Sequence, residues 1–291
     1  MRRQLFIALL LAATPFIACA QLAVRHIPEP DDFFEKPDPA SPRWTNAPVA
    51  MVTMMPQMIA TPSKMTVSTA ILEARALHNG RWLAVAVRWA DEQDDRLVNK
   101  DLNSDAVAIA FPVGEPGTTS PFMGGPGTPV EINHWKAVWQ RDVEQGYADI
   151  TDTHPNTAVV KYHGRTNTYD NDIKALAADP EASLAMPAIR LGNPVSQVNR
   201  VHPVEQLAAA GFTGTLTTQK KQDARASGRY ADGHWTVVLA RPLDSGDPQD
   251  RVLKPGVAHE INFAVWDGGE HDVGAKKSYS MLMPLTLDPL P

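Results

Sequence analysis

A glycine-rich loop carries the side chain best suited to ligate a metal. In residues 120–127 (SPFMGGPG), Met123 lies between Pro121 and Pro126, and three glycines let the backbone pass close to a bulky group. A thioether is a soft, neutral ligand that favours reduced haem iron and raises its reduction potential. The alternative is that Met123 fills the end of a hydrophobic core, since methionine adapts readily to gaps.

A second glycine-rich loop presents two neighbouring lysines. Residues 268–278 (GGEHDVGAKKS) contain Lys276 and Lys277. An unprotonated amine can also bind a metal, but charged loop residues are usually solvated. The pattern alone therefore assigns these lysines no role.

Methionines are concentrated near the start of the chain. Residues 51–65 (MVTMMPQMIATPSKM) contain Met51, Met54, Met55, Met58 and Met65. Clustered thioethers can bind Cu(I), but methionines also pack well on the face of a sheet. No Met-x-x-Met repeat extends the pattern beyond this segment, so packing is the favoured interpretation.

Familiar catalytic signatures are absent from the sequence. It contains no G-x-S-x-G, P-loop or H-E-x-x-H motif, and its nine histidines are scattered singly. Cys19 is the only cysteine. Disulfides, Cys-ligated Fe–S clusters and covalent c-type haem attachment are thereby excluded. Any haem must be held non-covalently.

The N-terminus predicts export to the periplasm. Arg2 and Arg3 precede an apolar run, residues 5–17, and Ala18-Cys19-Ala20 fits a cleavage site, so residues 1–20 are interpreted as a signal peptide. The alternative is lipid anchoring at Cys19. No segment has the roughly 20 apolar residues that a transmembrane helix needs.

The chain is acidic. Its net charge of −6 becomes −8 when Arg2 and Arg3 are removed with the signal peptide. This charge argues against binding to nucleic acid or anionic membranes. It fits a basic partner protein, or serves solubility alone.

The spacing of apolar residues predicts a mainly β protein, an antiparallel β-sandwich with short helices in the connecting loops. Hairpins are predicted around Asn79-Gly80 and Asp232-Gly233, dipeptides that favour type I′ turns. Further strands are expected at residues 105–111, 130–139, 260–266 and 277–287, and helices at residues 172–178 and 203–210. Residues 21–48, rich in proline and acidic residues, are interpreted as an arm, either ordered or docked on a partner, and residues 49–291 as one domain.

An ordered set of short segments is similar to a known family. These segments are WAD (89–91), DAVAIAFP (105–112), FMG (122–124), VEINHWKA (130–137), GN (192–193), PVEQL (203–207), GF (211–212), TLT (215–217), DGHWTVV (232–238), RPL (241–243), FAVWDG (263–268) and KKS (276–278). The chain resembles the haem-binding γ subunits of periplasmic molybdenum enzymes such as ethylbenzene dehydrogenase, dimethylsulfide dehydrogenase, chlorate reductase and selenate reductase. It departs from them at Asn133 and His134, where the family tends to have aromatic residues, and in a longer section around residues 145–175.

The resemblance implies a β-sandwich that holds one haem b between Met and Lys axial ligands. Met123 matches the methionine and Lys277 best matches the lysine, with Lys136 as the rival and Lys276 as the third choice. Such a subunit is non-catalytic. It passes electrons between the Fe–S β subunit of a complex, whose α subunit contains molybdenum, and a soluble or membrane electron carrier, for example a periplasmic cytochrome c.

A lysine ligand must be unprotonated. At pH 7, removing the proton from an ordinary lysine costs about 4.6 kcal/mol, and burial lowers this cost. The correct lysine should therefore be buried beside Met123. An exposed Lys277 with Lys136 pointing inward would reverse the assignment.

Other side chains could contact the macrocycle. Trp135, Trp139 and Trp235 could pack on it, although tryptophan in a β-sandwich is commonly a core residue. Arg88 and Arg241 could pair with haem propionates or form ordinary ion pairs.

Two other functions remain open at this point. One is a carbohydrate-binding β-sandwich module without redox function, because exposed tryptophans would serve sugars as well as haem. The other is a free-standing periplasmic cytochrome that has no catalytic partner.

Overall fold

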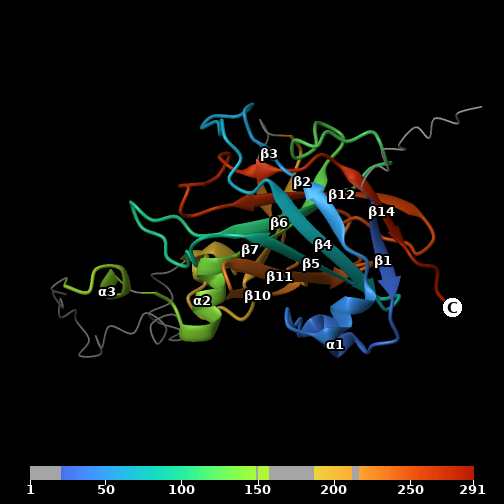
Figure 1. Ribbon diagram of the computed structural model, residues 1–291, viewed down its shortest axis with the longest axis horizontal. Coiled ribbons are helices and arrows are strands. Elements are labelled where there is room, and N and C mark those ends of the chain that lie inside the picture. The colour runs from blue at the N-terminus through green and yellow to red at the C-terminus, as the bar shows by residue number, and fades with distance from the viewer. Residues whose placement is uncertain (1–20, 149, 157–186, 212–215) are drawn as a thin grey trace, which may run out of the picture.

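A computed structural model describes residues 21–148, 150–156, 187–211 and 216–291 (Figure 1). The predicted signal peptide, residues 1–20, and the predicted helix at residues 172–178 lie outside the described residues. None of the helices in the described ranges is long and apolar enough to cross a membrane.

Most of the regular secondary structure of the described chain is β-strand, arranged in two layers, as the sequence predicts (Figure 1). Sheet A has the order β10 (Arg225–Ala231), β11 (His234–Pro242), β5 (Trp82–Ala90), β4 (Ile71–His78), β1 (Leu22–His26), β14 (Met283–Leu287) and β12 (Ala258–Trp266), and β2 (Ala50–Thr53) also pairs with β4. Sheet B continues from β12 through β6 (Ala106–Pro112), β7 (Val130–Lys136), β8 (Val204–Ala209) and β9 (Thr217–Thr218), while β13 (Ser278–Tyr279) pairs with β12 and with β3 (Met55–Pro56).

Strand β12 belongs to both sheets. Its first residues, Ala258–Ile261, pair with β14, and Asn262–Trp266 pair with β6. The two sheets are thus one hydrogen-bonded network that bends over itself, and its concave side encloses the main core.

Both predicted hairpins are present. In the turn between β4 and β5, the Asn79 side chain accepts hydrogen bonds from the backbone N–H groups of Arg81 and Trp82, and Gly80 has φ 88°. Between β10 and β11, Asp232 and Gly233 have φ 52° and 68°. Asp232-Gly233 thus has the two positive φ angles of the predicted type I′ turn. At Asn79-Gly80 only the glycine has a positive φ, so this hairpin is present but its turn is not type I′.

Three tryptophans fill the space between the sheets. Trp89, Trp135 and Trp235 are at most 1% exposed, and the rings of Trp135 and Trp235 meet edge to face at 4.9 Å. Gly228 on β10 gives Trp135 the room it needs, because a Cβ there would lie 2.2 Å from the indole ring. The sheets therefore pack closely through large aromatic side chains.

The first described segment is part of the sheet. β1 pairs in parallel with both β4 and β14, so the sheet is antiparallel except at this strand. After it, α1 (Asp31–Glu35) and the 3₁₀ helix η1 (Pro42–Asn46) cover the outer face of sheet A. Residues 21–48 thus form ordered structure against this chain's own sheet.

Two local predictions are wrong. Residues 203–210 are predicted as a helix but contain strand β8, which pairs with β7 and β9. Residues 130–139 are predicted as one strand, but β7 ends at Lys136 and helix α2 (Ala137–Gln145) follows. Pairing with distant strands overrides local propensity in the first case. The other short helices are α3 (Ile150–Thr153), α5 (Pro187–Arg190) and η3 (Pro194–Ser196).

Candidate cofactor pocket

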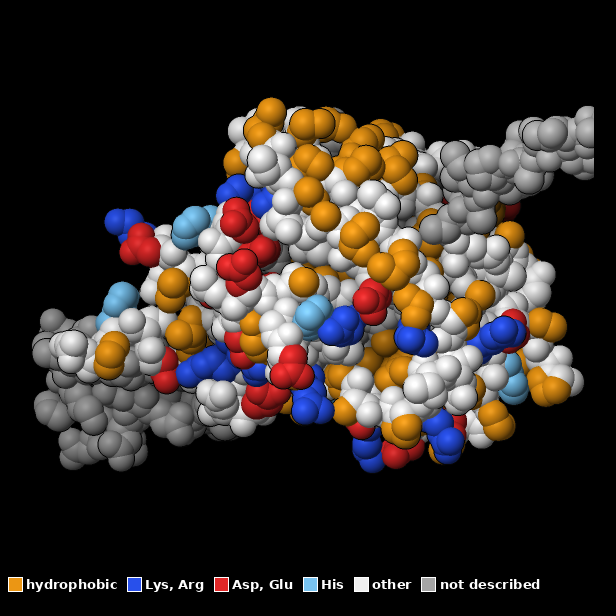
Figure 2. All heavy atoms as spheres, in the orientation of Figure 1, with side chains coloured by type: hydrophobic (Ala, Val, Ile, Leu, Met, Phe, Trp, Pro, Cys, Tyr) orange, Lys and Arg blue, Asp and Glu red, His pale blue; other side chains and the backbone are white. Residues whose placement is uncertain are grey.

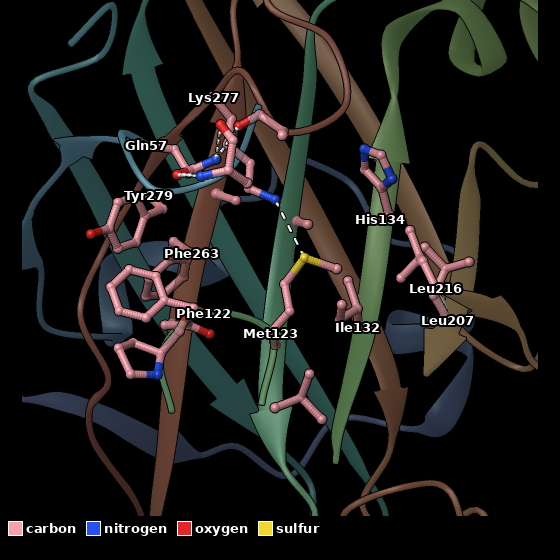
Figure 3. Close-up of a pocket in the computed structure, with 18 of the residues that line it drawn as sticks. Gln57, Phe122, Met123, Ile132, His134, Leu207, Leu216, Phe263, Lys277 and Tyr279 are labelled. Atoms are coloured by element: carbon pink, nitrogen blue, oxygen red, sulfur yellow. Dashed lines mark hydrogen bonds between the residues drawn. The ribbon is translucent and has the colours of Figure 1, made fainter. Parts of the chain in front are cut away.

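A pocket of about 330 Å³ lies on the outer face of sheet B (Figure 3). Its floor comes from outward-facing side chains of β6, β7, β8 and β12, mainly Ala108, Ala110, Ile132, Leu207 and Ala264. Ala108 and Ala264 are direct partners across β6 and β12. Their methyl groups leave a low, apolar floor beneath the pocket.

Met123 enters the pocket from a constrained loop. Its φ is 62°, a value that non-glycine residues rarely adopt. Its carbonyl accepts a hydrogen bond of 2.7 Å from the N–H of Gly211, and Gly124 follows with φ 73°. Residues held in such conformations are often found at functional sites.

Gly124 cannot easily be replaced by a larger residue. A Cβ at this position would lie 2.4 Å from the carbonyl oxygen of Thr128. The loop is also tied by the N–H of Gly124, which donates to the carbonyl of Ser120. The glycines noted in the sequence therefore fold the loop tightly and direct the Met123 thioether over the floor.

Lys277 points at Met123 from the opposite side of the pocket. Its Nζ lies 3.8 Å from the sulfur, as Figure 3 shows. Burial lowers the pKa of the Lys277 amine to about 8. Among the described residues, no carboxylate forms an ion pair with it, while the ring of Trp266 lies 4.9 Å away. Nothing there favours the charged form strongly enough to offset desolvation.

The rival lysines have other partners. Lys136 forms a 2.6 Å ion pair with Glu205 and lies over the ring of Trp139 at 3.9 Å. Lys276 donates from Nζ to the carbonyls of Glu270 and His271. The structure brings Lys277, and neither rival, to the Met123 sulfur.

His134 closes one end of the pocket. Its ring stacks on Trp266 at 4.6 Å, and its Nε2 has no hydrogen-bond partner within the described part of the chain. Burial, and then the charges of Lys136 and Lys277, hold the pKa of His134 well below its usual value. The imidazole is therefore neutral at pH 7. In the sequence His134 stands out only as a departure from the family, although period-two alternation with Ile132 could have placed it on the pocket face.

The tryptophans and arginines considered as cofactor contacts lie elsewhere. The assignment of Trp135 to cofactor binding is corrected, because it points to the opposite face of β7 from Ile132 and His134, into the core. Trp235 is in the same core, and Trp139 lies on α2. The two arginines form ion pairs, Arg241 with buried Glu131 at 2.8 Å and Arg88 with Glu73 at 3.5 Å.

The methionines of residues 51–65 differ in how far their side chains are buried, so they do not form one cluster. Met54 is 4% exposed and belongs to the core, whereas Met51, Met58 and Met65 are between 52% and 72% exposed. Figure 2 shows hydrophobic side chains gathered over the region of β3 and its loops. The packing interpretation holds for Met54.

The pocket's donor set fits a haem. A thioether and a desolvated amine face each other, the floor is apolar and low, and the rings of Phe122 and Tyr279 meet at 5.4 Å at the rim (Figure 3). The sequence did not assign Gln57, Phe122 and Tyr279 to the site, because two loops and strand β13 bring them to the pocket only in the tertiary structure.

The fold and the pocket thus define a mostly β protein with an apolar pocket in which a thioether and an amine of lowered pKa face each other. Residues 41–278 match the family described as ethylbenzene dehydrogenase. The chain belongs to this family, as the sequence resemblance predicts.

Its curated relatives carry related names. It is 27% identical over 250 residues to the chlorate reductase subunit gamma of Ideonella dechloratans, covering 84% of this chain and 77% of that protein. It is 22% identical over 243 residues to ORF7 of Haloferax mediterranei, whose name describes a respiratory nitrate reductase heme subunit, covering 83% of this chain and 65% of the relative. A Bacteroides uniformis structure described as carbohydrate-binding aligns over 93% of this chain and all of that one, at 8% identity and a TM-score of 0.44. That similarity is too low to inform ligand binding.

Proposed function

We propose that this chain is a periplasmic, non-catalytic γ-type subunit that binds one haem b non-covalently. Met123 and Lys277 are the proposed axial ligands. The subunit transfers electrons between the Fe–S subunit of a molybdenum oxidoreductase complex and a soluble or membrane electron carrier, such as a cytochrome c. Family membership and the names of the two curated relatives support this assignment.

One observation carries the proposal: the Lys277 amine, with a pKa of about 8, lies 3.8 Å from the Met123 sulfur in an apolar pocket. At pH 7, deprotonating this amine costs about 1.4 kcal/mol, compared with about 4.6 kcal/mol for an ordinary lysine. Burial in the pocket therefore removes most of the free-energy cost of deprotonating the lysine before any cofactor enters.

The bound haem would supply a one-electron redox couple. The chain's own residues would set its environment. Met123 presents a soft sulfur that favours the reduced state. The alanines of the floor and the rings at the rim exclude water and lower the local dielectric constant. The neutral imidazole of His134 adds no charge to the environment of the haem.

The test is a reduced-minus-oxidised visible spectrum combined with a pyridine haemochrome assay of the protein expressed with adequate haem supply. The proposal predicts a b-type spectrum and about one haem per chain. A colourless protein would contradict it, and binding to oligosaccharides would then be measured. Copurification from the native host distinguishes a subunit of a complex from a free-standing cytochrome, because only the subunit brings α and β partners with it.

A further inference from the structure

One segment next to the pocket holds the loop that carries Lys277. This segment, residues 57–68, is named the strap, and residues 267–278 are named the lysine loop. The strap contacts the lysine loop at three places: Gln57 with Ala275 and Lys277, Lys64 with Asp272, and Ser68 with Ser278. These contacts span more than 200 positions in sequence.

Gln57 makes the contacts closest to the ligand. Its backbone N–H donates to the carbonyl of Lys277 at 3.0 Å, and its Nε2 donates to the carbonyl of Ala275 at 3.1 Å (Figure 3). Its Oε1 accepts two hydrogen bonds, from the backbone N–H groups of Ile59 and Ala60. The residue is 6% exposed and also lines the pocket. The side-chain amide thus joins the turn of the strap to Ala275, two residues before Lys277, while the backbone N–H of Gln57 holds the carbonyl of Lys277 itself.

The middle of the lysine loop is anchored separately, at Asp272. Lys64 and Asp272 form an ion pair in which the side chains are 3% and 0% exposed. The second carboxylate oxygen of Asp272 accepts from the Ser68 hydroxyl at 3.1 Å. Because the lysine loop is already held at Asp272, loss of the Gln57 side-chain amide would loosen mainly the residues around Lys277.

We infer that Gln57 is a positioning residue for Lys277, an inference that rests on the proposed function. A lysine has a flexible four-carbon stem, so the place of its amine depends on how firmly the backbone beneath it is held. The Gln57 side chain fixes the carbonyl of Ala275 and its backbone N–H fixes that of Lys277, and together they keep the amine directed at Met123. The side-chain contact, which substitution removes, holds the amine where iron can compete with a proton for it.

The test is an acid titration of the oxidised, haem-loaded full chain, followed by its visible spectrum, with the reduction potential measured in parallel. A proton competes with iron for the Lys277 amine, so the ligand leaves as the pH falls. Gln57→Leu should raise the midpoint of this transition by about one pH unit, a tenfold weaker hold. Gln57→Asn keeps an amide but is one methylene shorter, and should shift the midpoint in the same direction by less.

Gln140→Leu is the matched control. Gln140 is also 6% exposed, and its Oε1 likewise accepts two hydrogen bonds, from Trp135 and from Gly228, but it does not line the pocket. The inference predicts that its midpoint equals that of the parent protein. A second outcome would also support the inference: both Gln57 variants fold but lose haem, while Gln140→Leu keeps its full haem content.

The outcomes separate the inference from the proposed function. A parent protein that binds no haem, or that shows no acid transition attributable to Lys277, overturns the proposed function and the inference with it. A parent protein with that transition, and unchanged midpoints and potentials in both Gln57 variants, overturns the inference alone. An equal shift in Gln140→Leu also overturns it, because the effect would then come from general loosening of the fold.

Discussion

At the scale of single residues, Met123 and Lys277 are each held in an unfavourable state. Met123 has a positive φ, and the Lys277 amine is buried without a carboxylate partner among the described side chains. Such states persist only when the surrounding structure imposes them. A binding role for the pair gives this arrangement a physical reason.

Removing the thioether tests Met123. In haem-loaded Met123→Ala, the visible spectrum should change and the reduction potential should fall by on the order of 0.1 V, since axial ligands set haem potentials over a range of about 0.8 V. Spectroelectrochemical titration measures both effects. An unchanged spectrum and potential would remove Met123 as a ligand.

Removing the amine tests Lys277 without any cofactor. The pKa of Lys277 falls from 10.5 to about 8 on folding, so the unfolded chain binds more protons between these values and stability rises with pH across that window. The burial penalty is therefore fully present below pH 8. Lys277→Met should stabilise the haem-free protein by about 3 kcal/mol at pH 7 and flatten its stability between pH 8 and 10.5.

Lys136→Met is the comparison for that experiment. It leaves Glu205, whose side chain is 3% exposed, without its ion-pair partner, so it should destabilise the protein. Urea unfolding at several pH values measures both variants. A stabilising Lys136→Met together with a destabilising Lys277→Met would show that the roles of the two lysines are reversed.

At the scale of elements, local signals predict the hairpins but not the partners of every strand. Asn79-Gly80 and Asp232-Gly233 specify turns within a few residues. In contrast, residues 203–210 contain good helix formers after a proline, and only pairing with β7 makes them a strand. Local sequence likewise cannot decide which lysine faces Met123, because the partners of Lys136 and Lys277 come from other elements.

The Met123 loop depends on its glycines in different ways. Gly124→Ala should destabilise the protein by about 2–3 kcal/mol and weaken haem binding, because it combines backbone strain with a Cβ only 2.4 Å from the Thr128 carbonyl oxygen. Gly127→Ala has a similar φ, 79°, but its Cβ would meet no atom within 4 Å, so about 1 kcal/mol is expected. Thermal unfolding and haem titration measure the difference. Equal effects would contradict the close-approach argument.

At the scale of the whole molecule, the chain closes its sheet with its first described strand. β1 lies between β4 and β14, and Leu22 and Val24 are fully buried. Composition suggests an arm for residues 21–48, since prolines and acidic residues dominate that segment. The five residues of β1 are too short a pattern to outweigh this composition, and their parallel partners are far away in sequence.

Deleting residues 21–27 tests the structural role of β1. Loss of the three buried side chains of Leu22, Val24 and Ile27 alone should cost about 4–9 kcal/mol, and the exposed edges of β4 and β14 should promote aggregation. Arg25→Ala is the control, because the Arg25 side chain is 54% exposed and its ion pair with Asp288 spans 3.4 Å. Thermal unfolding would contradict the account if the deletion and the control behaved alike.

Anomalous diffraction at the iron edge from crystals of the haem-loaded protein would locate the haem directly. We expect one iron per chain on the outer face of sheet B, bonded to the sulfur of Met123 and the Nζ of Lys277. Iron bonded to Lys136 or Lys276, or iron located between the two sheets, would contradict this assignment.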